Sequence, residues 1–317
     1  MVKVAIAGGT SNVALEVIDA LCAANKHEIL LLSRKDVPSI ETRPGVSWAK
    51  TDYLDVRQLV DLMRGTHTLL SFVVTQTDPN DITQKNLITA VVEAGVKRFA
   101  PSEWTLSSFE HMPWYAGKAE IRQYLKDLNR ERTVLEYCLF LPGLFTNYLT
   151  HPYKSAKHFN SFEMHIDFDR RRALIMEGSE DDRITLTTAQ DFAQIVARAV
   201  EYEGEWPVLG GIKGTEITIG ELLKLGERVR GAPFNVERLK ADDLKAGIVK
   251  ASWLPSVEHS GTQSEQMVAF ISMLTAGMLL GTSSGALNVS DEWNRVFPEY
   301  HFTSADGFLA KAWMGKP

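Results

Sequence analysis

Hydrophobic and polar positions up to residue 140 alternate between strand-like and helix-like patterns. Apolar or alternating runs predict strands at residues 2–7, 28–32, 46–50, 68–74, 97–100 and 133–140. Between them, apolar residues at helical spacing predict helices that begin at residue 13 and cover residues 56–63, 81–94 and 114–128. Strands that alternate with helices favour a parallel sheet with helices on both faces. We therefore predict an α/β fold built on an N-terminal doubly wound parallel sheet of the Rossmann type.

The alternation ends after residue 141, where shorter segments begin. Further strands are predicted at residues 161–166, 172–176, 183–186 and 234–239, and helices at residues 188–203 and 219–230. The rest is mainly helical, and the apolar run 267–280 is predicted to be a buried helix because it is too short to cross a bilayer. We predict a dinucleotide-binding domain over residues 1–148. A smaller α/β substrate-binding part, residues 149–317, is expected to be interleaved with it and to cover the cofactor site.

The turn after the first strand is a candidate dinucleotide site. A pyrophosphate binds at a helix start because the first backbone N–H groups lack intrahelical partners and the helix dipole favours an anion. The three glycine positions of the usual motif are occupied here by Gly8, Ser11 and Ala14. The Ser11 hydroxyl is a possible phosphate donor, and Asn12 tolerates a left-handed backbone. The residues expected to bind the cofactor here are Gly8, Thr10, Ser11, Asn12 and Val13.

The end of the second strand indicates which dinucleotide binds. An acidic residue there binds the ribose hydroxyls of NAD, whereas cations accommodate the additional phosphate of NADP. Ser33, Arg34 and Lys35 occupy the position, and the first acid, Asp36, lies beyond them. We therefore expect NADP(H), with Arg34 and Lys35 in contact with it. The alternative is a solvated basic turn.

Further candidates lie after the later strands, because ligands bind at the carboxyl ends of such sheets. These additional cofactor-binding candidates are Asp52, Ser71, Phe72, Gln76, Ser102, Glu103, Pro142 and Phe145. For Ser71 and Phe72 the alternative is an ordinary core strand. Pro142 and Phe145, on either side of Gly143, are expected to shape a nicotinamide pocket, which needs close backbone approach.

Composition narrows the class of protein. The net charge of −6 and the lack of a basic stripe with interleaved aromatic residues give no attraction for nucleic acid. The two cysteines, Cys22 and Cys138, are expected to be core residues in a reducing compartment, and no signal peptide precedes the first strand, which favours the cytoplasm. His151, His158 and His165 recur every seven residues, but no single helix presents them, and we expect no metal site.

Several motifs together resemble a known family. They are Gly8-Gly9-Thr10, Ser33-Arg34, Pro101-Ser102-Glu103-Trp104, Lys118, Pro142-Gly143-Leu144-Phe145, and the segment from Phe168 through Glu177-Gly178 to residues 187–191. In this order they resemble the isoflavone-reductase-like, or NmrA-like, branch of the atypical short-chain dehydrogenases. The resemblance spans most of the chain.

The resemblance implies an NADP(H)-dependent reductase of phenolic or polyketide-like small molecules, in which Lys118 supplies the acid–base function and lies at the cofactor. Tyr115 precedes Lys118 by three residues rather than the usual four, so the tyrosine's role is not carried over. An ammonium beside an apolar wall loses hydration, which lowers its pKa toward the working pH. The alternative for Lys118 is a solvated helix lysine.

Two other functions remain open from the sequence. One is a redox-sensing regulator that binds NADP(H) and a protein partner without catalysis, and the other is a non-redox isomerase or cyclase that retains the dinucleotide. Aromatic and methionine-rich walls suit a flat apolar ligand. Their expected members are Trp104, Trp114, Phe145, Tyr148, Trp253 and the helix over residues 267–278.

Overall fold

The computed structural model of the chain describes residues 2–36, 44–256 and 265–317. The chain forms two compact units and passes between them several times. Unit 1 comprises Met1–Trp104, Trp114–Leu141 and Phe192–Gly210, and unit 2 comprises Thr105–Pro113, Pro142–Asp191 and Gly211–Pro317. The division at residue 148, and the packing of one part over the other, stay predictions.

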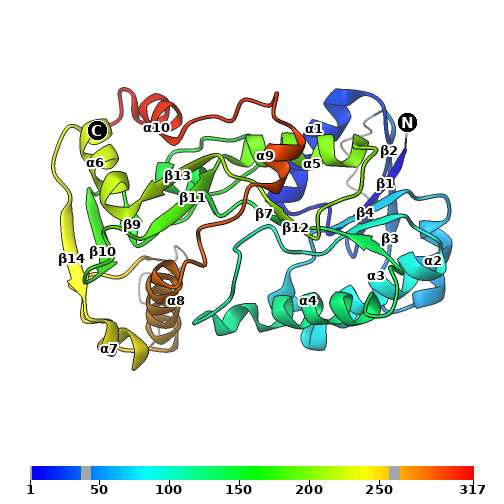
Figure 1. Ribbon diagram of the computed structural model, residues 1–317, viewed down its shortest axis with the longest axis horizontal. Coiled ribbons are helices and arrows are strands. Elements are labelled where there is room, and N and C mark those ends of the chain that lie inside the picture. Colours follow the sequence, from blue (N-terminus) through cyan, green and yellow to red (C-terminus); the bar gives the residue numbers. More distant parts are fainter. Residues whose placement is uncertain (1, 37–43, 257–264) are drawn as a thin grey trace. The chain divides into compact units, whose positions relative to one another are not determined.

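A six-stranded parallel sheet forms the centre of unit 1 (Figure 1). Its strands are β1 (Lys3–Ala7), β2 (Glu28–Ser33), β3 (Val46–Lys50), β4 (Thr68–Ser71), β5 (Arg98–Ala100) and β6 (Glu136–Tyr137). They lie in the order β3-β2-β1-β4-β5-β6, and each neighbouring pair is parallel. The direction of the strand order reverses between β1 and β4, and dinucleotides bind at such a switch point. The predicted doubly wound parallel sheet is confirmed.

Helices cover both faces of this sheet. They are α1 (Asn12–Ala24), α2 (Val56–Met63), α3 (Ile82–Glu93), α4 (Ala116–Leu128) and α5 (Ala189–Glu201). Figure 1 shows α1 and α5 on one face and α2, α3 and α4 on the other. Right-handed crossovers produce this division, because the chain runs outward from β1 to β2 and later in the opposite direction from β4 to β6.

Two strands of unit 1 differ from their predicted limits. β4 stops at Ser71. The next residue, Phe72, still donates its N–H to the Ala7 carbonyl (2.7 Å), but its ring stacks on Trp104 and the chain leaves the sheet there. The strand predicted over residues 133–140 is divided into β6 and β7 (Leu139–Leu141). The chain changes partners there: the Cys138 N–H donates to β5, whereas β7 pairs with β12 (Leu209–Gly211).

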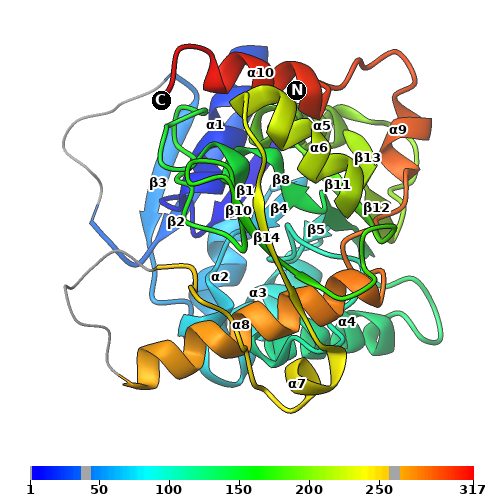
Figure 2. The same ribbon diagram turned by 90° about the vertical axis from the view of Figure 1, so that its left-hand side faces the viewer.

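Two three-stranded sheets and most of the later helices form unit 2. The sheets contain β8 (Leu144–Phe145), β11 (Arg183–Thr187) and β13 (Thr215–Thr218), and β9 (Ile166–Asp167), β10 (Arg172–Met176) and β14 (Asn235–Leu239). The helices are α6 (Ile219–Arg230), α7 (Ala241–Lys245), α8 (Glu265–Ser283), α9 (Glu292–Val296) and α10 (Ala305–Trp313). Figure 2 shows α7 where β14 ends, with α8 beside it.

The strand predicted over residues 161–166 is largely wrong, since only Ile166 of that segment belongs to a strand. Glu163 points inward instead. Its buried carboxylate forms ion pairs with Arg170 (2.9 Å) and Arg172. Ion pairs of Glu163 hold the middle of this segment, and backbone bonding to β10 begins only at His165, whose carbonyl accepts the Leu174 N–H (2.8 Å).

Helix α8 differs in part from the prediction of a buried helix. Its first residues are exposed, including Met267, Val268 and Phe270, and burial begins at Ile271. By length and composition α8 is able to cross a membrane, which contradicts the prediction that it is too short to do so, and 44% of its apolar window is buried inside the protein. A uniformly apolar run does not reveal which of its turns pack, which explains why the exposed first turns of α8 were not predicted.

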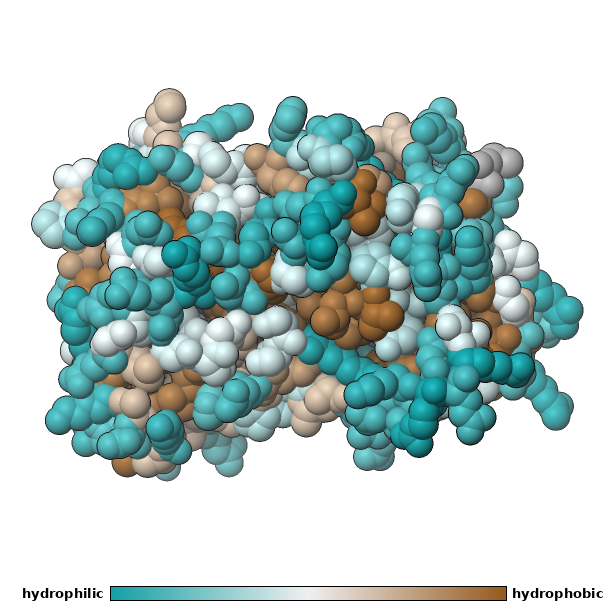
Figure 3. Space-filling model, viewed as in Figure 1, coloured by the Kyte–Doolittle hydropathy of each residue, from teal (hydrophilic) through white to brown (hydrophobic). Residues whose placement is uncertain are grey.

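On the face of the molecule in Figure 3, hydrophobic side chains form separate patches among hydrophilic ones.

Candidate functional site

Gly8 forms the first turn after β1 and has a left-handed backbone (φ +70°). A Cβ atom at Gly8 would lie 2.7 Å from the backbone carbon and oxygen of Phe72 and 3.0 Å from the Val73 nitrogen. Real Cβ atoms do not approach a backbone this closely, so only glycine fits without displacing the start of the loop after β4. The turn therefore depends on Gly8 for both its conformation and its packing.

Ser11 caps α1. Its hydroxyl oxygen accepts the Ala14 N–H (3.3 Å), and its own N–H donates to the Gly8 carbonyl (3.1 Å). The cap leaves the N–H groups of Asn12 and Val13 without intrahelical acceptors, as anion binding at a helix start requires. The turn does not require the left-handed backbone that Asn12 would tolerate, because Asn12 is the first residue of α1 and Gly8 is the left-handed residue of the turn. Thr10 is exposed beside this helix start.

Arg34 and Lys35 follow β2 directly, and both side chains are exposed. Buried Ser33 fixes the turn, because its hydroxyl accepts the Lys35 N–H (3.0 Å) and its carbonyl accepts the Thr51 N–H (2.9 Å). The carbon of the Arg34 guanidinium lies 6.0 Å from the centre of the Tyr53 ring. Two cations are thus presented at the carboxyl end of β2.

The cofactor-binding candidates at the ends of β3 and β4 differ in their exposure to solvent. Asp52 is exposed, and its carboxylate accepts the Leu54 N–H (2.9 Å). Gln76 is also exposed, in a single turn of 3-10 helix. Ser71 and Phe72 are buried, which fits the core-strand alternative, although their backbone adjoins Gly8. The Ser71 hydroxyl is a buried oxygen without a hydrogen-bond partner among the residues that the structure describes.

Lys118 lies in the first turn of α4 and is buried, with 8% of its surface exposed. Its ammonium donates hydrogen bonds to the carbonyls of Ser102 and Glu103, the second at 2.9 Å. It also lies 5.5 Å from the centre of the Tyr115 ring. The alternative of a solvated helix lysine is therefore wrong.

Burial lowers the pKa of Lys118 to about 8; the Glu103 carboxylate opposes the shift and the Arg122 guanidinium adds to it. Arg122 follows Lys118 by four residues, so both emerge from one face of α4. The Arg122 guanidinium donates two hydrogen bonds, at 3.1 and 2.7 Å, to one oxygen of the buried Glu103 carboxylate. α4 thus holds Glu103 by its side chain through Arg122 and by its backbone through Lys118.

Pro142 and Phe145 belong to unit 2. Between them, Gly143 has φ +70°, and a Cβ there would lie 2.5 Å from the Thr185 carbonyl oxygen, so the close backbone approach at Gly143 is to β11. The Phe145 ring is buried against Phe159, with ring centres 5.1 Å apart. Their contribution to a nicotinamide pocket stays a prediction.

Left-handed residues occur in the segments that lead from four strands of the parallel sheet in unit 1 to the next helix. They follow β1, β3, β4 and β5 and comprise Gly8, Tyr53, Asn80, Asp81 and Trp104. Tyr53 and Trp104 are the unusual members, because bulky residues rarely adopt this conformation and such strained residues collect at functional sites. This signal is independent of the motifs and indicates the same edge of the sheet.

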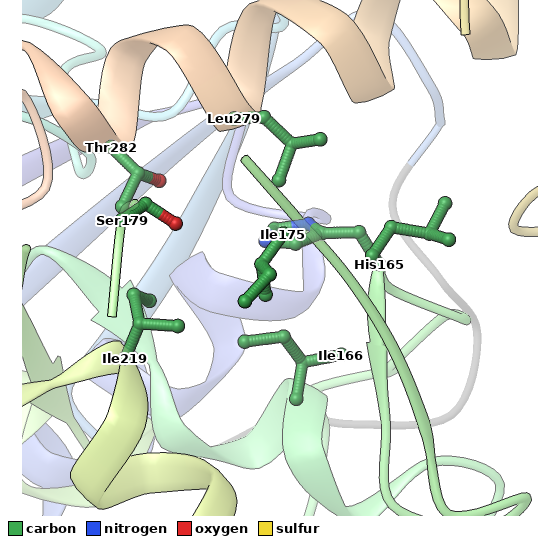
Figure 4. A pocket seen from close by; sticks show the side chains of 8 residues that line it. His165, Ile166, Ile175, Ser179, Ile219, Leu279 and Thr282 are labelled. Carbon is green, nitrogen blue, oxygen red and sulfur yellow. The ribbon is translucent and has the colours of Figure 1, made fainter. Parts of the chain in front are cut away.

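The cavity shown in Figure 4 lies within unit 2, and none of its lining residues belongs to unit 1. It is lined by His165, Ile166, Leu174, Ile175, Ser179, Ile219, Leu279 and Thr282. Its volume of about 10 Å³ accommodates a single water molecule rather than a substrate. Burial lowers the pKa of His165 to about 4, so the imidazole is neutral at physiological pH. In the part of the chain that the structure describes, no three His, Cys, Asp or Glu side chains are grouped as metal ligands.

The fold and the turn at Gly8 define a Rossmann-type α/β protein with the features of a dinucleotide site. The chain belongs to the NmrA-like family, whose model matches residues 2–277.

Among known proteins, the chain is 26% identical to the oxidoreductase BOA1 of Botryotinia fuckeliana, over 95% of this chain and 97% of that protein. A crystal structure of an isoflavone reductase is similar with a TM-score of 0.71 at 18% identity, covering 98% of both chains. The protein AtPrR2, solved with NADP+ and (+)pinoresinol, is similar with a TM-score of 0.70 at 18% identity and the same coverage.

Proposed function

We propose that the chain is an NADPH-dependent reductase that transfers hydride to a conjugated aromatic or polyketide-derived small molecule, with Lys118 as the proton donor. The observation that carries this proposal is the buried ammonium of Lys118, held by two carbonyls at the carboxyl end of β5. The turn at Gly8 lies at the same edge of the same parallel sheet. The names of the relatives support it, since BOA1 is called an oxidoreductase and AtPrR2 was solved with NADP+ and an aromatic ligand.

The residues of unit 1 fit NADP(H). The N–H groups at the start of α1 suit the pyrophosphate, Gly8 permits close approach, and Arg34 and Lys35 suit the ribose phosphate. The cofactor supplies hydride when it is bound. Thr10, Asp52 and Gln76, all exposed, are assigned to its binding by position only.

Lys118 supplies the proton that the substrate oxygen takes up. Reduction of a carbon conjugated to an oxygen places negative charge on that oxygen, and a nearby ammonium stabilises the charge and then delivers a proton. The two carbonyl bonds hold Nζ in place and leave one N–H for the substrate oxygen. Because its pKa is about 8, the group releases a proton far more readily than an ordinary lysine.

The choice of cofactor has a direct test in the turn after β2. The double substitution Arg34→Asp with Lys35→Ala should weaken NADPH binding about 100-fold, since both cations facing the ribose phosphate are lost and a repulsive charge is added. The NADH affinity should stay within about threefold, because NADH lacks that phosphate. Titration calorimetry with both dinucleotides measures the two constants. Equal losses for both would show that the basic turn only supports the fold.

The pH dependence of turnover should report Lys118. The ammonium is present below its pKa of about 8 and lost above it, so kcat/KM should fall as the pH rises through 8. Glu103→Gln removes the carboxylate that favours the ammonium and should move this fall to lower pH. Arg122→Gln removes a repelling cation and should move it to higher pH. Shifts in the same direction for both variants would contradict the assignment.

The proposal as a whole is tested by titrating the purified chain with NADPH and NADH, then following nicotinamide absorbance with conjugated aromatic ketones, enones and quinones. Selective NADPH binding with oxidation by any of them supports a reductase. Tight binding without oxidation would favour the regulator or the non-redox enzyme. A reducing compartment such as the cytoplasm fits the proposal, since Cys138 is buried and Cys22 is half-buried, as expected of small core residues.

A further inference from the structure

Tyr53 lies in the loop between β3 and α2, beneath the turn at Gly8, and only 2% of its surface is exposed. Its hydroxyl donates to the Leu32 carbonyl (2.7 Å) and accepts the Gly8 N–H (3.1 Å). The Gly8 N–H is shared, because it also donates to the Leu32 carbonyl (3.2 Å). One hydroxyl therefore joins the ends of β1 and β2 where the candidate cofactor turn begins.

The hydroxyl keeps this arrangement over the physiological pH range. Burial raises the pKa of Tyr53 to about 12, so the phenol stays protonated and continues to donate to Leu32.

The Tyr53 ring lies near the second part of the candidate cofactor site. The carbon of the Arg34 guanidinium is 6.0 Å from the ring centre, the outer limit of a cation–π contact. Arg34 is otherwise an exposed side chain on a turn. The ring thus lies within reach of a cation that we assign to the ribose phosphate.

The backbone of Tyr53 is held in a strained conformation by its neighbours. Its φ of +67° is unusual for a residue other than glycine. The Asn86 side chain donates to the Tyr53 carbonyl (2.9 Å), and the Tyr53 N–H donates to the Thr51 hydroxyl (3.1 Å). Such strain persists only where the surroundings determine it, and here it directs the side chain under Gly8.

We propose that Tyr53 is a positioning residue that supports both phosphate-binding elements of the cofactor site, the Gly8 turn through its hydroxyl and Arg34 through its ring. This inference rests on the proposed binding of NADP(H). The hydroxyl contributes to affinity for either dinucleotide, whereas the ring contributes to the preference for NADPH over NADH.

Two variants separate the two parts. Tyr53→Phe removes only the hydroxyl and should weaken NADPH and NADH equally, by about 5- to 10-fold, the worth of one hydrogen bond. Tyr53→Leu also removes the ring and should lower the NADPH preference by a further factor of about three. In an Arg34→Ala background, Tyr53→Leu should no longer change that preference beyond Tyr53→Phe.

Tyr137→Phe is the matched control, because Tyr137 is a buried tyrosine on β6 of the same sheet, at the opposite end from β3. Calorimetric dissociation constants and thermal unfolding are measured for each chain. Affinities of Tyr53→Phe within twofold of the wild type, with or without a lower melting temperature, would overturn the hydroxyl's role. An unchanged NADPH preference in Tyr53→Leu would overturn the ring's role. Wild-type protein that binds neither dinucleotide would instead overturn the proposed function.

Discussion

Replacing Lys118 with alanine should lower turnover at least about 100-fold while the affinity for NADPH stays within about threefold. The loss is that of a positioned proton donor, which contributes roughly 100- to 10,000-fold to catalysis. Binding should be retained because the turn at Gly8 and the cations after β2 lie on other loops of the sheet. Single-turnover absorbance measurements with a reducible substrate, together with calorimetry for NADPH, measure both quantities.

Two further variants make this result specific. Lys126→Ala removes an exposed lysine from the last turn of the same helix and should leave turnover unchanged. Lys118→Arg retains the positive charge, but a guanidinium does not release a proton near neutral pH. This variant should therefore be as inactive as Lys118→Ala. Unchanged turnover in Lys118→Ala, or a loss that follows a fall in melting temperature equally in all three chains, would remove lysine from the mechanism.

The parallel sheet was predictable because apolar or alternating runs of strand length follow one another with helical patterns between them, and β1, β2 and the helix after β1 lie close to their expected limits. The predicted strand limits were wrong where contacts with distant parts of the chain determine the end of a strand. The chain exchanges β5 for β12 at Cys138, and Glu163 turns inward to two arginines. Neither event leaves a pattern in the local sequence.

The candidate site shows the same division between local and distant causes. The left-handed conformation of Gly8 could be expected because glycine adopts it readily. Ser11 could be recognised as an N-cap because it is a serine directly before an apolar helical pattern. The burial of Lys118 was not detectable, because its partners come from residues 102 and 103, on another loop. The placement of Tyr53 under Gly8 depends on a left-handed tyrosine, which no sequence pattern indicates.

Gly8→Ala should abolish NADPH binding, with a loss of at least about 100-fold, and should lower the free energy of unfolding by about 2–5 kcal/mol. The left-handed backbone accounts for about 1–2 kcal/mol of this, and the displacement of Phe72 for the rest. The added methyl group would lie 2.7 Å from backbone atoms of Phe72, so the turn or the loop after β4 must move. Movement of the turn displaces it relative to the N–H groups at the start of α1, and movement of the loop displaces the backbone beside the turn.

Gly95→Ala separates backbone strain from the close approach. Gly95 has nearly the same φ, +69°, but a Cβ there meets nothing within 4 Å. It should lower the free energy of unfolding by only about 1 kcal/mol and leave the NADPH affinity unchanged. Urea unfolding and calorimetry on the two variants test the pair, with folding of Gly8→Ala first verified by circular dichroism. Equal free energies of unfolding for Gly8→Ala and Gly95→Ala would show that the Phe72 backbone moves aside at little cost. A folded Gly8→Ala chain that binds NADPH normally would show that the cofactor does not lie against this turn.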